Sequence, residues 1–402
     1  MEVPILEPFA GLRYDPSIPL DDVIAPPYDV VGPRQRALLA DRHPANSIHV
    51  ELPVDDTSSG TDRYQVAAEI LGSWVREGVV LRDSAPCLYS YQMTEPNGAT
   101  TNGVIGALGC DPAAGDVLPH EQTIPKDMSD RLDLLRACRA NLSPIWGLSL
   151  TEGLSKIYAP SVASDQEATD DSGVLHRLWV IDDPATIESV TLAVAESPVV
   201  IADGHHRYDT AGAYRAERRA ANHGAPGGYD SVMALVVELA EEQLSVGAIH
   251  RVLSLPPGEL PAGEGLVDLL RRWFECERVG DPTEQLAGEL VAARTLALLT
   301  PSGAWALSAL PESYEAAGSD LDSSLVSLAL VALDGAAVSF VDDWRDAARA
   351  VSNDEASAAF LLRPVTVTQI SAWARSGRRM PPKSTYFHPK PRTGMVFRTL
   401  EV

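Results

Sequence analysis

One strand–turn–helix segment, Ser197–Ala220, constrains this chain more than any other part of its sequence. It reads SPVVIADGHHRYDTAGAYRAERRA. Pro198–Ala202 is short and β-branched and ends at Asp203-Gly204, which predicts a buried strand. Apolar residues then return at helical spacing. We therefore expect a helix capped by Asp203, with Gly204 as the flexible joint between strand and helix.

The first turn of this predicted helix gathers groups that bind anions. Unpaired backbone N–H groups and the positive end of the helix dipole attract negative charge there. His205, His206 and Arg207 add side-chain donors, and an arginine can grip a phosphate with two hydrogen bonds. Asp203 can hold a magnesium ion or accept a proton. The predicted phosphate-binding residues are Gly204, His206, Arg207 and Thr210, the predicted catalytic residues are Asp203 and His205, and the predicted metal ligand is Asp203.

Adjacent histidines also raise the alternative of a metal site. Zinc ligands on a helix usually lie one turn apart. The side chains of His205 and His206, as neighbours, diverge by about 100° on a helix. The spacing therefore disfavours one metal ion held by both.

Two carboxylates outside this segment are candidate general bases. Glu121 follows Pro119-His120 on a predicted loop, and the second histidine of the H-E-x-x-H zinc motif is absent. We predict that Glu121 acts as a base or a metal-holding carboxylate, with a solvated loop acid as the alternative. Asp29 follows Pro26-Pro27-Tyr28, a stiff segment that can hold a carboxylate in place.

The tail PPKSTYFHPKPR is basic within an acidic chain. Lys383, Ser384 and Lys390 belong to it, and we predict that they bind an anion. The alternative is a basic edge strand whose lysines discourage pairing between sheets. The pairs His176-Arg177 and His250-Arg251 are ambiguous in the same way, because either pair can simply end a strand.

Charge and cysteine content narrow the class of protein. The 56 acidic residues exceed the 32 basic ones, giving a net charge of −24 that repels nucleic acid and anionic membranes. The 4 cysteines are far apart, which argues against a zinc knuckle or a disulfide framework. The apolar run Leu325–Val341 is interrupted by Asp334-Gly335, and no basic-then-apolar leader opens the chain. We expect a cytoplasmic protein with neither a nucleic acid nor a membrane partner; the sequence leaves its oligomeric state open.

Turn residues divide the chain. Pro256-Pro257-Gly258 predicts a boundary between a catalytic domain, residues 1–255, and a C-terminal α/β domain, residues 256–402, that contributes the basic segment. Within the first domain we expect a helix over 61–78 and a hairpin of 87–94 with 101–108. The Ser- and Asp-rich stretch Ala159–Gly173 is expected to be a mobile loop.

The D-G-H-H-R pattern of Asp203–Arg207 resembles the motif of the ParB and sulfiredoxin-like superfamily, whose members bind nucleotide phosphates at this turn and include free-serine kinases. Sulfiredoxins carry a cysteine where His205 stands, and partition proteins carry Glu-Arg-Arg, so neither chemistry carries over. The whole chain resembles an uncharacterised family catalogued as domain of unknown function 1015. The matching segments are PFAGLRY (8–14), APPYDVV (25–31), PHEQT (119–123), DRLDLL (130–135), HRVL (250–253) and PKSTYFHPKPRTGMVF (382–397).

The resemblance implies an α+β fold with a ParB/sulfiredoxin-like nucleotide-binding core. Together with the predicted anion site, it implies a kinase that uses ATP or ADP with Mg²⁺ and phosphorylates a small hydroxylated metabolite, free L-serine being the leading candidate. Neither a Walker A loop nor a protein-kinase catalytic loop is present in the sequence. The alternatives are a noncatalytic nucleotide-binding switch and a phosphate-ester hydrolase that uses His205 or His206.

Overall fold

The chain folds into two compact units. A computed structural model describes residues 5–58, 60–119, 128–159, 162–256, 263–333 and 335–400. Unit 1 comprises Met1–Ser245, Ala374–Arg378 and Pro389–Val402, and unit 2 comprises Val246–Trp373 and Arg379–His388. The predicted boundary after Leu255 falls inside unit 2. The basic tail is divided between the units, since Lys383 and Ser384 belong to unit 2 and Lys390 to unit 1.

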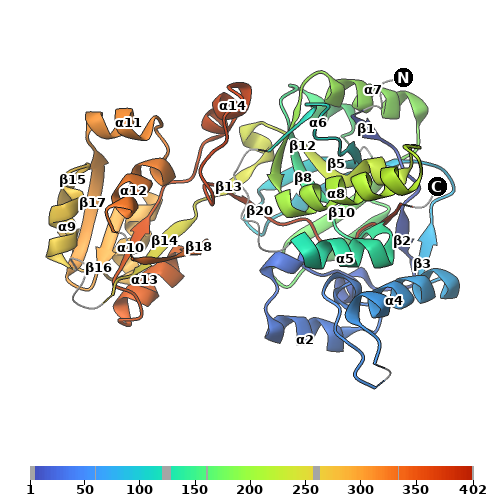
Figure 1. Cartoon of the computed structure of the whole chain (residues 1–402), viewed down its shortest axis with the longest axis horizontal. Coiled ribbons are helices and arrows are strands. Elements are labelled where there is room, and N and C mark those ends of the chain that lie inside the picture. Colours follow the sequence, from blue (N-terminus) through green and yellow to red (C-terminus); the bar gives the residue numbers. More distant parts are fainter. Residues whose placement is uncertain are drawn as a thin grey trace. The chain divides into compact units, whose positions relative to one another are not determined.

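Unit 1 is built on a mixed nine-stranded sheet (Figure 1). In spatial order its strands are β6 (Val117–Pro119), β11 (Val199–Asp203), β8 (Ile145–Ser149), β12 (Ser231–Glu238), β5 (Thr100–Gly109), β4 (Leu88–Thr94), β10 (Leu175–Ile181) and β9 (Gln166–Thr169), and β1 (Leu6–Glu7) pairs with β5. The predicted hairpin is confirmed as the antiparallel pair β4 and β5. Two short pairs complete the unit: β2 (Leu12–Tyr14) with β3 (Val80–Arg82), and β7 (Ala140–Asn141) with β21 (Arg398–Thr399).

Helix α4 of unit 1 begins and ends where local chemistry predicts. The side chain of Asp62 accepts hydrogen bonds from Tyr64 and Gln65 at the start of α4 (Arg63–Glu77), and Gly78, with φ of 73°, ends it. The remaining helical segments are α1 (Leu20–Val23), η1 (Tyr28–Val30), α2 (Pro33–Arg42), α3 (Ile48–Glu51), α5 (Met128–Cys138), α6 (Leu154–Ile157), α7 (Pro184–Ala195), α8 (His205–Ala221), η2 (Gly228–Asp230) and η3 (Glu241–Gln243).

The core of unit 1 fixes α8 against the sheet. Val190 and Val194 of α7 pack into the same buried cluster as Val199 and Ile201 of β11, and Tyr208 and Ala211 of α8 join it. Helices α8 and α5 lie side by side (Figure 1). Apolar packing therefore holds both the strand before the β11–α8 joint and the helix after it.

Unit 2 is a six-stranded antiparallel sheet with helices on both faces. Its strand order is β15 (Phe274–Gly280), β17 (Gly303–Ala309), β16 (Ala297–Thr300), β19 (Ala358–Leu361), β14 (His250–Ser254) and β18 (Ala337–Val341). Ala358 and Phe360 enter one core with α9 and α12, while Ala359 and Leu361 enter another with α10 and α13, as the two-residue period of a strand requires. The helices are α9 (Glu264–Leu270), α10 (Glu284–Ala292), α11 (Pro311–Ala317), α12 (Asp322–Val331), α13 (Trp344–Ser352) and α14 (Val367–Arg375), and β13 (Ser245–Gly247) pairs with β20 (Tyr386–His388).

One segment differs from its prediction. The stretch Ala159–Gly173, expected to be a mobile loop, contains β9, and the side chain of Asp170 beyond that strand is 6% exposed. Its polar composition is explained by turns and by buried partners rather than by mobility. Among the described residues no helix is long and apolar enough to cross a membrane. The architecture is a mixture of helices and sheets, as the predicted α+β class requires, while the ParB/sulfiredoxin-like core stays a prediction.

Candidate phosphate-binding site

The joint between β11 and α8 requires a glycine. Gly204 has φ of 86° and ψ of 28°, a left-handed conformation, and is itself the residue that precedes the first turn of α8. A Cβ atom there would lie 3.0 Å from a methyl carbon of Ile145 and 3.1 Å from Nη2 of Arg207. The prediction that Asp203 caps the helix is wrong. Asp203 is the last residue of β11, and its carboxylate turns to two cations instead.

One of those cations, Arg207, is four residues from Asp203 in the sequence, and the other, Lys390, is 187 residues away. Lys390 Nζ lies 2.5 Å from one oxygen of Asp203, and Arg207 Nη2 lies 3.3 Å from the other. Burial alone would raise the pKa of Asp203, but the charges of Lys390 and Arg207 lower it to about 2. Asp203 is therefore ionised at neutral pH and is a weak proton acceptor. Lys390, which was predicted to bind an anion, lies at this site.

The turn that leads into β8 accepts hydrogen bonds from the guanidinium of Arg207. Its Nη1 donates to Ser143 Oγ at 2.9 Å and to the carbonyl of Pro144 at 2.6 Å. Three of its N–H donors are thus engaged within the protein, while Nε is buried without an acceptor among the described residues. Burial would lower the pKa of Arg207, but Asp203, Asp29 and Glu51 raise it, so the guanidinium stays charged. The edge formed by Nε and Nη2 is the part of the fork left for a ligand.

The end of α8 leaves backbone donors for that ligand. Gly204 has no side chain with which to cap the helix, and the first bond internal to α8 runs from the Tyr208 N–H to the Gly204 carbonyl at 3.0 Å. The N–H groups of the first turn therefore lie at the start of a helix of 17 residues, where the helix dipole favours an anion. His205 and His206 stand in this turn, half-buried, and Nδ1 of His206 is buried with no partner in the described part of the chain.

A second group of residues surrounds Arg207 and was not singled out from the sequence. Ser143 Oγ donates to Glu51 Oε1 at 3.1 Å, and Glu51 is 2% exposed. The guanidinium of Arg131 lies 4.3 Å from the ring centroid of Tyr28 and donates to the Glu51 carbonyl at 2.9 Å. Burial raises the pKa of Tyr28 to about 12, so its phenol is protonated at neutral pH. Arg131 was visible only as part of a family segment, and nothing in the sequence marks Glu51.

Behind Arg207 lies a small cavity of about 60 Å³. Thr210 belongs to its wall, is 3% exposed, and its hydroxyl has no hydrogen-bond partner among the residues that the structure describes. The polar lining residues are Glu51, Arg131, Asn141, Ser143, Arg207 and Thr210, and the apolar ones are Leu134, Leu135, Ala140, Leu142 and Val232. The structure thus places Thr210 in the wall of the cavity that Arg207 also lines.

The other predicted site residues fall into three groups. Asp29 is exposed in η1, within electrostatic range of Arg207. Lys383 and Ser384 belong to unit 2, where Ser384 Oγ lies 2.8 Å from Ser323 Oγ and the Lys383 carbonyl accepts a hydrogen bond from Arg251. Their assignment to a phosphate site stays a prediction. Glu121 lies outside the described residues, and so do its neighbours in the PHEQT segment beyond Pro119.

The described donors do not fit a magnesium ion held by the protein. Within the described ranges no group of three or more His, Cys, Asp or Glu side chains converges as a metal site. Both oxygens of Asp203 are already paired with cations, so a metal ion would have to displace Lys390 or Arg207. The metal assignment of Asp203 stays a prediction without support from this geometry.

Comparison with solved structures finds 8 matching chains, and three of those similar to this chain are described here. A conserved hypothetical protein from Pyrococcus furiosus is 13% identical with a TM-score of 0.36, over 72% of this chain and 93% of that one. A free serine kinase in complex with AMP is 13% identical with a TM-score of 0.37, over 75% and 92% of the two chains. SbnI with a C-terminal truncation, from Staphylococcus aureus, is 14% identical with a TM-score of 0.38, over 71% and 82%.

Comparison with curated proteins finds no match. The model of one protein family, described as protein of unknown function (DUF1015), matches residues 6–331, which include the β11–Gly204–α8 joint and most of the residues around it. On that match, the chain belongs to the DUF1015 family.

Proposed function

We propose that unit 1 binds a nucleotide by its phosphates at Asp203–Arg207 and transfers a phosphoryl group to a small hydroxylated acceptor. The observation that carries this proposal is the convergence of a left-handed glycine turn, an uncapped helix start and two cations, Arg207 and Lys390, on one point. Backbone donors and fixed positive charge are what phosphoryl transfer asks of a protein. They occur here in a chain whose net charge is −24.

The roles of the cations follow from what already engages them. Arg207 offers Nε and the remaining hydrogen of Nη2 to a phosphate, while Ser143 and Pro144 hold its other nitrogen. Lys390 carries a compact charge with three N–H donors, so it can donate to a phosphate oxygen while it stays in contact with the Asp203 carboxylate. Asp203 holds both cations in place through its two carboxylate oxygens.

The base must be a carboxylate other than Asp203. With a pKa of about 2, Asp203 would take up a proton only at strongly acidic pH. We assign the base to Glu121, because β6 ends at Pro119, two residues before it, and Pro119 pairs with Ile201, two residues before Asp203. Asp29 is the alternative. The base would accept the proton of the acceptor hydroxyl as its oxygen bonds to phosphorus and the bond to the leaving nucleotide breaks.

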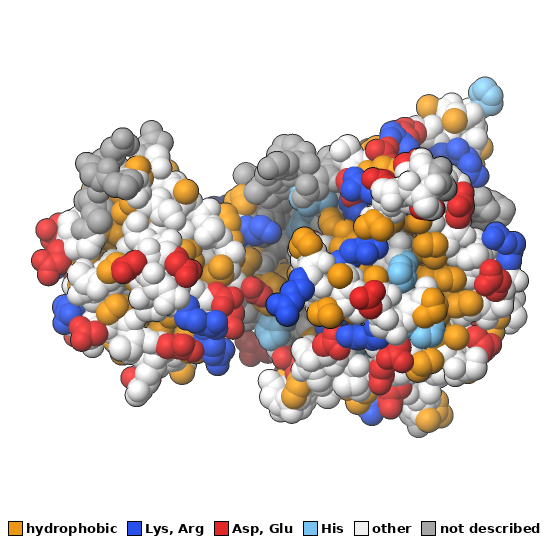
Figure 2. All heavy atoms as spheres, turned by 90° about the horizontal axis from the view of Figure 1, so that it is seen from below, with side chains coloured by type: hydrophobic (Ala, Val, Ile, Leu, Met, Phe, Trp, Pro, Cys, Tyr) orange, Lys and Arg blue, Asp and Glu red, His pale blue; other side chains and the backbone are white. Residues whose placement is uncertain are grey.

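The acceptor and the wider fold are proposed from the motif. Free L-serine is the leading candidate, and the ParB/sulfiredoxin-like core is the fold assignment, because of the D-G-H-H-R resemblance at Asp203–Arg207. The donor is proposed to be ATP or ADP. Nucleic acid is not the proposed partner. On the face drawn in Figure 2, Lys and Arg side chains are interspersed with Asp and Glu rather than gathered into one basic surface.

The test is incubation of the purified chain with ATP or ADP, with and without Mg²⁺, and a panel of amino acids and polyols, followed by mass spectrometry of the acceptors. The His206→Ala variant should lose nucleotide affinity about tenfold or more, since a charge-assisted phosphate contact contributes about 1.5–3 kcal/mol. His223→Ala, at the other end of the same helix, is the matched control and should bind like the wild type.

Each result has a distinct meaning. Binding without transfer to any acceptor would favour a noncatalytic nucleotide switch. Release of phosphate from esters without transfer to an acceptor would favour the hydrolase. Absence of nucleotide binding at millimolar concentration would overturn the proposal.

A further inference from the structure

A closed ring of hydrogen bonds lies beside the phosphate site and is not part of it. One oxygen of Asp170 accepts from His176 Nε2 at 2.9 Å and from Arg392 Nε at 2.9 Å, and Arg392 Nη2 also contacts it. The other oxygen accepts from the Ser172 N–H and hydroxyl and from the Val174 N–H. The Asp170 side chain is 6% exposed and that of Arg392 is 13% exposed.

The ring assigns each proton. Because an ionised carboxylate only accepts, His176 Nε2 carries the hydrogen and Nδ1 is a bare acceptor. The Tyr91 hydroxyl, 2.8 Å from Nδ1, therefore donates to His176 and accepts from the backbone N–H of Arg392 at 3.2 Å. Burial lowers the pKa of His176, in keeping with this neutral form. Tyr91 and His176 are both fully buried, so each hydrogen bond is costly to lose.

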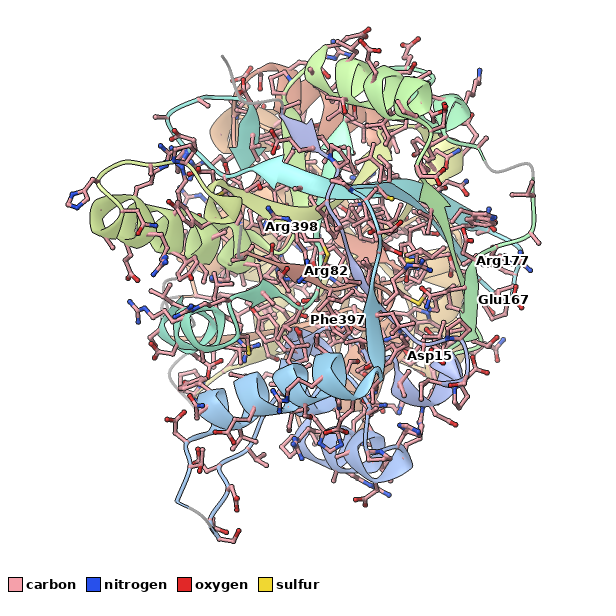
Figure 3. The ribbon with its side chains drawn as sticks, turned by 90° about the vertical axis from the view of Figure 1, so that its right-hand side faces the viewer. Asp15, Arg82, Glu167, Arg177, Phe397 and Arg398 are labelled. Atoms are coloured by element: carbon pink, nitrogen blue, oxygen red, sulfur yellow. The ribbon has the colours of Figure 1, made fainter. Side chains whose placement is uncertain are left out.

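This ring holds the segment that carries Lys390. Lys390 lies between Pro389 and Pro391, whose rings fix the backbone φ angle on both sides of it. Arg392 follows at once, and Thr393 then exchanges two backbone hydrogen bonds with Ala25. The segment is thus stiff from its anchor at Arg392 to the ammonium group at Asp203. Further on, Phe397 and Arg398 lie at the centre of unit 1 (Figure 3), 0% and 6% exposed.

We infer that Tyr91, Asp170, His176 and Arg392 are positioning residues that fix Lys390 at the phosphate site without touching a ligand there. The inference rests on the proposed function in that Lys390 is taken to bind phosphate. The positioning of Lys390 can be tested apart from nucleotide binding, because the ring sets where the Lys390 ammonium group lies even when no nucleotide is present.

The variant that tests this is Tyr91→Phe, which removes one hydroxyl and opens the ring at two bonds with almost no change in volume. Tyr229→Phe is the matched control, since Tyr229 is also buried in unit 1 and its hydroxyl donates to the carbonyl of Ala225 at 2.6 Å. Two quantities are measured on the full chain. The first is the rate at which acetic anhydride acetylates Lys390 without nucleotide, read by mass spectrometry; the second is nucleotide affinity and turnover.

We expect Lys390 in Tyr91→Phe to be acetylated several times faster than in the wild type, since it leaves its buried pair more often. We expect the nucleotide to bind about tenfold more weakly, about the loss of one net hydrogen bond, with turnover at saturation unchanged. The Tyr229→Phe control should match the wild type in both. In a Lys390→Met background, Tyr91→Phe should weaken nucleotide binding no further, because its effect passes through the missing side chain.

Wild-type acetylation of Lys390 in Tyr91→Phe would overturn the inference, as would equal acceleration in Tyr229→Phe. An additive loss of affinity in the Lys390→Met background would overturn it too, since the ring would then act by another route. If the wild type binds no nucleotide, the proposed function fails, and the acetylation rates alone still decide whether the ring places Lys390.

Discussion

Replacing Lys390 with methionine should destabilise unit 1 in a manner that depends on pH. Asp203 and Lys390 are 19% and 10% exposed, so the pair is little screened by solvent. The pKa of Asp203 falls from 3.8 to about 2 on folding, which corresponds to about 2 kcal/mol of stability. Because the folded pKa is depressed, this stability is present above pH 3.8 and is lost as the pH falls through about 2.

In Lys390→Met the buried carboxylate loses the largest charge that lowers its pKa and keeps those of Arg207 and His205, so the burial that raises this pKa is less opposed. We expect the free energy of unfolding at pH 7 to fall by about 2 kcal/mol or more, toward the cost of breaking a buried pair. At pH 2.5 the difference from the wild type should shrink toward zero, because Asp203 is then losing its charge in both proteins. Comparing variant with wild type at each pH cancels the titration of the other carboxylates.

The assay is urea unfolding at several pH values, followed by hydrogen exchange of the peptide Val199–Ala221, which reports on unit 1 alone. A double-mutant cycle with Asp203→Asn isolates the pair, and its coupling energy should be about 2 kcal/mol. A coupling energy below about 0.5 kcal/mol, or the same destabilisation at pH 7 and pH 2.5, would refute the reasoning.

Three further predictions concern the same site. Gly204→Ala should lower the free energy of unfolding by about 2 kcal/mol, and Gly224→Ala, equally left-handed but in open space, by about 1 kcal/mol, in thermal or urea unfolding; equal losses would show that the contacts with Ile145 and Arg207 do not matter. Thr210→Val should leave stability unchanged or raise it by up to about 1 kcal/mol in urea unfolding, because it removes a buried hydroxyl that has no partner among the described residues; a clear loss would reveal that the hydroxyl is bonded after all. Glu121→Gln should reduce turnover by about 10² or more and leave nucleotide affinity within twofold of the wild type, with Asp29→Asn as the control; the opposite pattern would move the base to Asp29.

The sequence was most informative where the decisive residues are neighbours. The strand before Asp203, the helix after Gly204, the α4 helix with its Asp62 cap and the β4–β5 hairpin all depend on contacts within a few residues. The prediction of an anion site at the Gly204 turn rests on the same local features and stays a prediction. The expectation that Arg207 lies close to that turn rests on them too.

Long-range pairs account for what the sequence did not show. Asp203 was expected to cap α8, but its carboxylate binds Lys390, which is 187 residues away. A charged ammonium group forms a stronger hydrogen bond with a carboxylate than a backbone N–H group does. Asp170 was expected in a mobile loop because its stretch is rich in Ser and Asp, but it pairs with Arg392, which is 222 residues away. The composition of a single stretch carries no information about such a partner. Glu51 and Ser143 were missed for the same reason, since only the fold brings them to Arg207.

The division of unit 1 along the chain has a consequence for how the protein is made. The chain leaves unit 1 at Ser245 and returns for its last stretch at Pro389, with nearly all of unit 2 in between. A ribosome must therefore translate through Arg392 before Asp203 can meet Lys390, and until then a nascent chain holds that carboxylate next to Arg207 alone. Any messenger cut short within the codons for unit 2 would yield a polypeptide with the whole D-G-H-H-R motif but without the lysine that pairs with Asp203.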